Sequence, residues 1–225
     1  METVQLIALS MGVAWASGIN LYAAIAMLGL MGATGSMELP PGLEVLQHPG
    51  VIMAAGFMYC VEFFADKMPG VDTGWDTLHT FIRIPAAAIL AAGAVGEVDP
   101  AVTLMAGILG GALAATSHTL KAGTRVLINT SPEPFSNIGV SVAEDTLVLA
   151  GLAGAIFYPV EFLVFLALFV AAAVWLLPKI WRGVKFVLAR IASVFGGGRA
   201  RPATPSGLTL KRGPAQAQPR LESGA

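Results

Sequence analysis

Long apolar stretches repeated along most of the chain constrain the fold more than any other feature of this sequence. Each approaches the roughly 20 residues that a helix needs to cross the hydrocarbon core of a bilayer. Only 12% of the 225 residues are charged and 56% are hydrophobic, and the mean hydropathy is +0.74. A water-soluble domain cannot cover its surface with so few charges, so we predict an all-α, polytopic transmembrane helical bundle.

Six apolar stretches are long enough to be spans, and we predict them at residues 4–31, 49–64, 78–95, 101–120, 138–157 and 160–177. The first contains the run SGIN at residues 17–20, which favours a helix only weakly. A break is therefore expected there, and one broken helix, two short helices and a re-entrant segment all remain open. The start of the chain resembles the apolar core of a signal peptide but has no basic flank, so we expect this span to be retained.

The chain changes character after the sixth span. We assign residues 1–177 to the transmembrane domain and residues 178–195 to an amphipathic basic helix, either lying in the membrane interface or extending the last span. Its basic side chains suit contact with anionic lipid. Residues 196–225 are rich in Gly, Pro, Ala and Arg, a composition that predicts a disordered tail.

Lysine and arginine indicate the orientation. Nine of the thirteen follow residue 177, and the other four lie in or beside the two polar loops, DKMPGVDTGWD and INTSPEPFSN. Because basic residues are enriched on the cytoplasmic side of membrane proteins, we expect the C-terminus to lie in the cytoplasm. We expect the protein to reside in the inner (plasma) membrane. Six spans would then place the N-terminus in the cytoplasm as well.

Ionisable residues at the ends of the spans and in the adjoining loop segments recur at helical spacing, which places them on shared faces. The helix of the third span carries three at i, i+3 and i+7, that of the fourth repeats this spacing, and that of the second carries an i, i+4 pair. An isolated charge at the bilayer centre costs about 2.5–3.5 kcal/mol, so such groups are expected to face the bundle interior and to pair. The candidate residues for binding a solute or ion are Glu62, Asp66, Asp76, His79, Arg83, His118, Lys121, Arg125, Glu144 and Asp145.

These residues also have simpler interpretations. Lys121 and Arg125 could extend to the headgroups of the inner leaflet, and Arg83 could hold helices together through an acidic partner. His79 and His118 fit proton carriers or metal ligands, but no ligand motif surrounds them, and we favour hydrogen-bonded polar histidines. We predict no metal site and no cofactor.

Three segments resemble a known family. SGINLYAAIAMLGL, EFFADKMPGVDTGWDTLHTFIR and SHTLKAGTRVLINTSPEPFSNIGVSVAEDTLV are similar to segments of bacterial membrane proteins grouped as domain of unknown function 4126. The resemblance covers roughly residues 5–177 and excludes the tail. It implies an integral membrane protein, and it supplies no substrate, cofactor or catalytic residue.

Our leading hypothesis is a small transporter or channel-like protein that binds a solute or ion in a charged cavity on the cytoplasmic side. Asn20, at the break of the first span, could contribute to that site from the opposite side. The alternative is a structural or regulatory membrane protein whose charges hold the helices together and whose basic tail attracts anionic lipid or a partner. An intramembrane enzyme is the least favoured class, because neither G-x-S-x-G nor H-E-x-x-H occurs. The bilayer is the expected partner, a homo-oligomer remains open, and nucleic acid is not expected. The net charge of -1 does not by itself indicate a partner.

Overall fold

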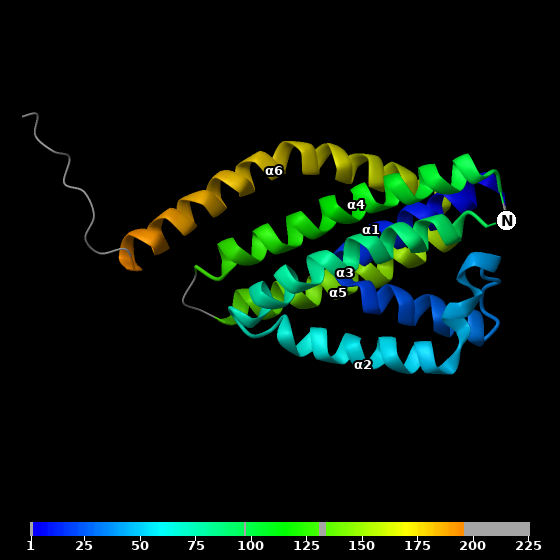
Figure 1. The fold of residues 1–225 in the computed structure, drawn as a ribbon, viewed down its shortest axis with the longest axis horizontal. Helices are drawn as coiled ribbons and strands as arrows, with labels where there is room; N and C mark the ends of the chain where they lie inside the picture. The colour runs from blue at the N-terminus through cyan, green and yellow to red at the C-terminus, as the bar shows by residue number, and fades with distance from the viewer. Residues whose placement is uncertain (1, 97, 131–133, 196–225) are drawn as a thin grey trace, which may run out of the picture.

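The computed structural model describes residues 2–96, 98–130 and 134–195, and these ranges form helices without any strand. The predicted all-α bundle of apolar helices is thus confirmed (Figure 1). The predicted tail and the loop residues 131–133 lie outside the described residues. In chain order the helices are α1 (Thr3–Ala33), the short 3₁₀ helix η1 (Pro41–Gln47), α2 (Pro49–Ala65), α3 (Val71–Ala94), α4 (Pro100–Ile128), α5 (Pro134–Phe157) and α6 (Pro159–Phe195).

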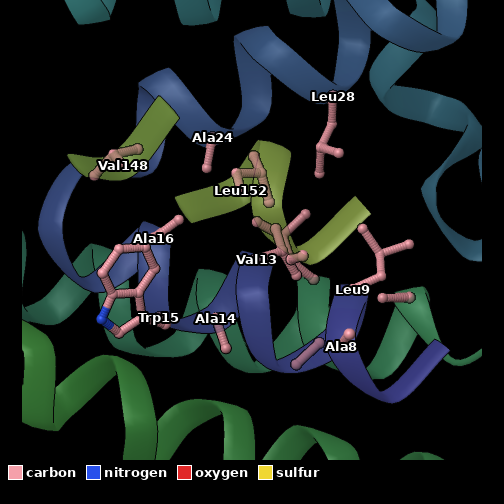
Figure 2. Close-up of a cluster of buried hydrophobic side chains, with 14 of the residues drawn as sticks. Ala8, Leu9, Val13, Ala14, Trp15, Ala16, Ala24, Leu28, Val148 and Leu152 are labelled. Carbon is pink, nitrogen blue, oxygen red and sulfur yellow. The ribbon is translucent and has the colours of Figure 1, made fainter. Parts of the chain in front are cut away.

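Helix α1 does not run straight but folds back on itself at Asn20, where the backbone leaves the helical region at φ −146° and ψ 98°. A straight helix of 31 residues would be about 46 Å long and would separate its two ends by that distance. Instead, Leu6 near its start borders the same pocket as Pro40, which follows its end. Figure 2 shows the two arms side by side, with Val13 on the first and Ala24 on the second. The broken first span is therefore a re-entrant hairpin, with a first arm at residues 3–19 and a second arm at residues 21–33.

The hairpin changes the topology predicted from six crossings. By length and hydropathy, α1, α3, α4, α5 and α6 each qualify as a span, and η1 with α2, bent by 72°, could form a sixth. Because both arms of α1 open toward one end, the chain crosses the bundle only through α2 to α6, and the start of α1 lies opposite the end of α6 (Figure 1). The start of α1 and the end of α6 thus lie at opposite ends of the bundle, whereas six crossings would place them at the same end.

We name the two ends of the bundle by their charges. The basic end holds the α2–α3 turn, the α4–α5 connection and the end of α6, and the described basic residues of α6 lie toward it. The acidic end holds the open end of the hairpin, η1 and the α3–α4 and α5–α6 junctions. Its charged side chains among the described residues are Glu2, Glu38, Glu44, Asp99 and Glu161.

The hairpin occupies the centre of the bundle. In its most apolar stretch 72% of the residues are buried, compared with 17–33% in the other membrane-length helices. Trp15 on the first arm is fully buried, and Phe162, Phe165 and Phe169 of α6 pack edge-on against its ring at 5.4–6.1 Å between centroids. The other helices therefore surround α1 and present their remaining apolar side chains outward, as lipid-facing helices do.

Several helices extend beyond the predicted spans toward the basic end. Helix α3 begins at Val71 rather than at residue 78, and α4 ends at Ile128 rather than at residue 120. The predicted spans stop where charged residues begin, because these residues lower the local hydropathy. In the structure these charges are paired inside the bundle, and the helices continue through them. Helix α6 also continues through Pro178 to Phe195, so residues 178–195 are an extension of the last helix rather than a separate one.

Candidate functional site

A cluster of charged side chains lies beneath the tip of the hairpin, and Arg83 of α3 is its deepest basic member. Its Nη2 donates to Glu62 Oε1 of α2 at 2.6 Å, and its Nη1 donates to Asp76 Oδ1 at 2.9 Å. Both the guanidinium group and its acidic partners are buried. Arg83 lies twelve residues into α3, about 18 Å from the start of that helix. The helical spacing that predicted this pairing is thus realised deep within the bundle.

The ammonium group of Lys121, on α4, contacts residues from α1, α2 with its C-cap, and α3. Its Nζ donates to Asp66 Oδ2 at 2.7 Å and to Glu62 Oε1 at 3.1 Å, and it lies 3.7 Å from Asp76 Oδ1. It also donates to the main-chain oxygen of Ile19 at 3.0 Å. With only 4% of the residue exposed, Lys121 does not extend toward lipid headgroups.

Arg125, one turn further along α4, links the cluster to α5. Its Nη2 donates to Glu144 Oε2 and lies 3.5 Å from Asp66 Oδ2. Its Nη1 donates to the main-chain oxygen of Asp66 at 2.8 Å and to the side chain of Asn137. Arg125 is also fully buried, so its alternative role at the membrane surface is excluded in this structure.

The tip of the hairpin is held by the same region. The Ile19 carbonyl at the end of the first arm accepts from Lys121, which compensates the negative end of that half-helix. Asn20 caps the start of the second arm, because its Oδ1 accepts from the backbone N–H of Ala23 at 3.0 Å. Its Nδ2 donates to Asp145 Oδ1 of α5 at 3.1 Å. The polar groups exposed by the break are thus bonded to α4 and α5.

The two candidate histidines, His79 and His118, are hydrogen-bonded at both ring nitrogens. Arg83 has only donors, so His118 Nδ1 accepts from it at 3.2 Å, and His118 Nε2 donates to Thr80 Oγ1 at 2.7 Å. His79 Nδ1 donates to the Trp75 carbonyl at 2.9 Å and its Nε2 lies 3.1 Å from the Tyr22 hydroxyl. His118 is consequently neutral and adjoins the cluster, whereas His79 lies apart from the ion pairs.

Lys67, in the turn after α2, lies at the edge of the cluster nearest the basic end. Its Nζ donates to the Phe63 carbonyl at 3.1 Å and to Ser141 Oγ of α5 at 3.3 Å. Partial burial lowers the pKa of the Lys67 ammonium, while the carboxylates of Asp145 and Asp66 act in the opposite direction. This side chain connects the surface at the basic end with the interior of the bundle.

The charged cluster is closed, not an open cavity. Its side chains pack against one another, with Glu144 the most exposed of the ion-paired groups at 15% of its side chain. A groove of about 230 Å³ between α3, α4 and α6 reaches His118 but is lined mainly by apolar residues such as Ile180 and Val184. Among the described residues, each basic group of the cluster is paired with carboxylates and largely buried, so the ion pairs do not line the open cytoplasmic cavity that we expected.

The cluster contains more acids than bases. It brings together five carboxyl groups and three basic groups, an excess of two acids, and counting Lys67 at its edge still leaves an excess of one. Four buried carboxylate oxygens have no hydrogen-bond partner among the described residues: Glu62 Oε2, Asp66 Oδ1, Asp76 Oδ2 and Asp145 Oδ2. These atoms could accept protons, water or a cation.

Sequence reasoning missed several polar residues around the cluster. Asp72 is fully buried and accepts from Asn129 Nδ2 at 2.8 Å and from the backbone of Gly70 and Thr73. Its position one turn before Asp76 on the same helix face was the available signal. Asn137 lies just before the predicted fifth span and was therefore assigned to a loop. Nothing in the sequence indicated that it would bind Arg125.

Comparison with known proteins identifies the family. The family model described as domain of unknown function (DUF4126) matches residues 7–179, most of the chain. The protein belongs to this family. No curated protein and no solved structure matches the chain. In this DUF4126 protein the matched region contains every helix that contributes to the charged cluster and leaves out the end of α6.

Proposed function

We propose that this DUF4126 protein is a membrane transporter that binds a small ion or solute at the charged cluster. The observation that supports this most strongly is the excess of two acids over bases among the buried and part-buried side chains of the cluster beneath the hairpin tip. A net charge buried away from water is costly, so such a cluster favours uptake of protons or of a positively charged species. Exchange of these species across the membrane is a transport function.

The re-entrant hairpin supports the same proposal. Transporters commonly place their binding sites where discontinuous helices end inside the membrane, because half-helix ends present free backbone groups and dipoles there. In this protein the break at Asn20 meets Lys121 on one arm and Asp145 beside the other. A shift of the hairpin tip would release both residues at once. The closed cluster would then correspond to an occluded state between two open ones.

Flux through reconstituted protein tests the proposal. Purified protein in liposomes is expected to move protons or small ions when gradients of H⁺, Na⁺, K⁺, NH₄⁺, Cl⁻ and small carboxylates are imposed in turn, followed with pH-sensitive and potential-sensitive dyes. Glu62→Gln is expected to reduce flux at least tenfold, since Glu62 contacts both Arg83 and Lys121. Glu161→Gln, an exposed residue at the acidic end, is the matched control and should retain flux. Absence of flux for every gradient would overturn the proposal.

A structural role is the second candidate, and a specific observation favours it. The three basic groups tie α2, α3, α4 and α5 together, and each has at least two polar partners. Under this alternative the wild type transports nothing, and Glu62→Gln lowers the unfolding temperature without any change in flux. The same liposome experiment, paired with thermal unfolding, therefore separates the two functions. Neither proposal assigns a chemical reaction to the protein.

We also propose an orientation and a lipid partner. The basic end would face the cytoplasm of the inner membrane, because Lys and Arg gather there, which leaves the start of α1 on the outer side. On α6, Lys179 lies over the Trp175 ring and Lys185 over the Trp181 ring, an arrangement typical of the lipid headgroup region. Anionic lipid should raise the unfolding temperature of the wild type more than that of a variant with Lys179, Arg182 and Lys185 changed to Gln. Self-association remains a prediction.

A further inference from the structure

Asp145 differs from every other acid of the charged cluster. Glu62, Asp66, Asp76 and Glu144 each lie within 4 Å of a basic group, whereas no ion pair involves Asp145 among the described residues. It is 8% exposed, its Oδ1 accepts a single hydrogen bond from Asn20, and its Oδ2 has no partner. A buried carboxylate with one neutral donor and no counter-ion is held only weakly in its charged form.

Asp72 provides a contrast, because it too is buried and has no ion pair within the described part of the chain. It accepts hydrogen bonds from the backbone N–H groups of Gly70 and Thr73 at 2.8 and 2.6 Å, and two more contacts come from Asn129 Nδ2 at 2.8 and 3.0 Å. Several donors of this kind stabilise an ionised carboxylate without a cation. Asp72 therefore needs no further ligand, whereas Asp145 lacks equivalent support.

From this contrast we propose that Asp145, held by Asn20 at the tip of the hairpin, is the proton-binding residue that couples transport to the proton gradient. The inference rests on the proposed transport function and specifies its coupling ion. Protonation would remove the negative charge that attracts the Asn20 N–H. The contact between the second arm of the hairpin and α5 would weaken, and the hairpin tip could move.

The surroundings favour a proton over a metal ion. Asn20 presents its N–H to Asp145, because its amide oxygen is already engaged by the backbone of Ala23. A metal cation needs several oxygen ligands, and the described residues contain no group of three or more His, Cys, Asp and Glu side chains that could hold one. A proton requires only the unpartnered Oδ2.

The surroundings of Asp145 leave both its protonated and its ionised state accessible. The Asn20 hydrogen bond and the positive end of the second arm favour the carboxylate, and burial without a counter-ion favours the acid. Other titratable groups face it from the packed elements, and most of these are engaged elsewhere. They are Tyr59 and Asp66 of α2, Lys67 of the following turn, Lys121 of α4 and the adjoining Glu144 of α5.

A polar connection leads from the basic end to this residue. Lys67 is partly exposed in the α2–α3 turn, and its Nζ donates to Ser141 Oγ at 3.3 Å. Ser141 and Asp145 are four residues apart on α5, so they lie on the same face one turn from each other. Protons from the basic end could thus approach Asp145 along α5.

Infrared spectroscopy of the purified full-length protein, with isotope-labelled aspartate, tests the site without relying on flux. A protonated aspartate band should titrate between about pH 4 and 9, and Asp145→Asn should abolish it. Asp72→Asn, which removes an acid with full hydrogen bonding, is the matched control and should leave the band in place. Absence of any titrating aspartate band in this range, or its survival in Asp145→Asn, would overturn the inference.

A second variant keeps the inference testable if Asp145→Asn does not fold, and it also tests the role of Asn20. Asn20→Ala removes the only donor to Asp145 among the described residues, so the band should remain but its titration midpoint should move upward by about one pH unit. An unchanged midpoint in folded Asn20→Ala protein would contradict the inference. A proton flux that persists unchanged in Asp145→Asn would likewise reject Asp145 while leaving the transport function intact. A titrating band without any flux would reject transport instead.

Discussion

At the scale of single residues, removal of the Lys121 ammonium is expected to destabilise the protein strongly. Lys121→Met would leave the carboxylates of Glu62 and Asp66 and the Ile19 carbonyl without their shared donor. Breaking a buried ionic network by removing one partner typically costs about 3 to 5 kcal/mol, because the remaining charge is buried and uncompensated. We expect this loss in the free energy of unfolding, measured by denaturant titration in detergent micelles.

Lys67→Met is the control for that prediction. Lys67 is partly exposed and forms no ion pair among the described residues, so its loss should cost about 1 kcal/mol or less. Equal destabilisation by the two variants would mean that Lys121 does not act through its buried carboxylate partners.

Residue patterns predicted the faces of the helices but not their partners. The spacing of Asp76, His79 and Arg83 correctly indicated one buried face, because helical geometry alone fixes which residues share a side. Which helix faces which is set by the packing of the whole bundle. For this reason the sequence could not show that Arg125 binds Glu144, nor that neighbouring Asp145 lacks a basic partner.

At the scale of the helices, the hairpin depends on a close approach between its first arm and α4. A Cβ atom on Gly18 would collide with the Ser117 hydroxyl and lie 2.9 Å from Ala114 Cα, so the backbones would have to separate. Gly18→Ala should therefore lower the free energy of unfolding by about 1 to 3 kcal/mol, as overpacking of a close contact does. Thermal unfolding monitored by circular dichroism provides the measurement.

Gly56→Ala in α2 is the matched control for this prediction. A Cβ atom there would meet nothing within 4 Å, and alanine favours the helix more than glycine does. We expect a neutral effect or a gain of up to about 1 kcal/mol. Equal stability of Gly18→Ala and Gly56→Ala would contradict the close contact between the hairpin and α4.

Hydropathy identified the apolar helices but did not indicate whether the chain of α1 continues across the bundle or turns back. The apolar run of α1 predicted a membrane segment, and its weak SGIN stretch predicted a break, because both are local properties of the chain. Whether the second half continues or returns depends on contacts with Lys121 and Asp145, which are more than one hundred residues away. The sequence therefore left three arrangements open, and only the fold selects the hairpin.

At the scale of the whole molecule, the hairpin makes a prediction that separates five crossings from six. In the re-entrant arrangement, the residues just before and just after α1 lie on one side of the membrane, and the end of α6 lies on the other. With six crossings, the residues flanking α1 would lie on opposite sides, and the start of α1 would share a side with the end of α6. These patterns differ whichever side is cytoplasmic.

Cysteine labelling distinguishes the patterns. In a Cys60→Ala background, which removes the single native thiol, cysteines are introduced singly at Thr3, Ser36 and Ser193. A membrane-impermeant maleimide added to intact cells or to inverted vesicles should label Thr3→Cys and Ser36→Cys from one side, and Ser193→Cys from the other. Labelling of Thr3→Cys and Ser193→Cys from the same side would require α1 to cross the membrane. The Asn20 break would then not turn the chain back, and the charged cluster could not lie beneath a re-entrant tip.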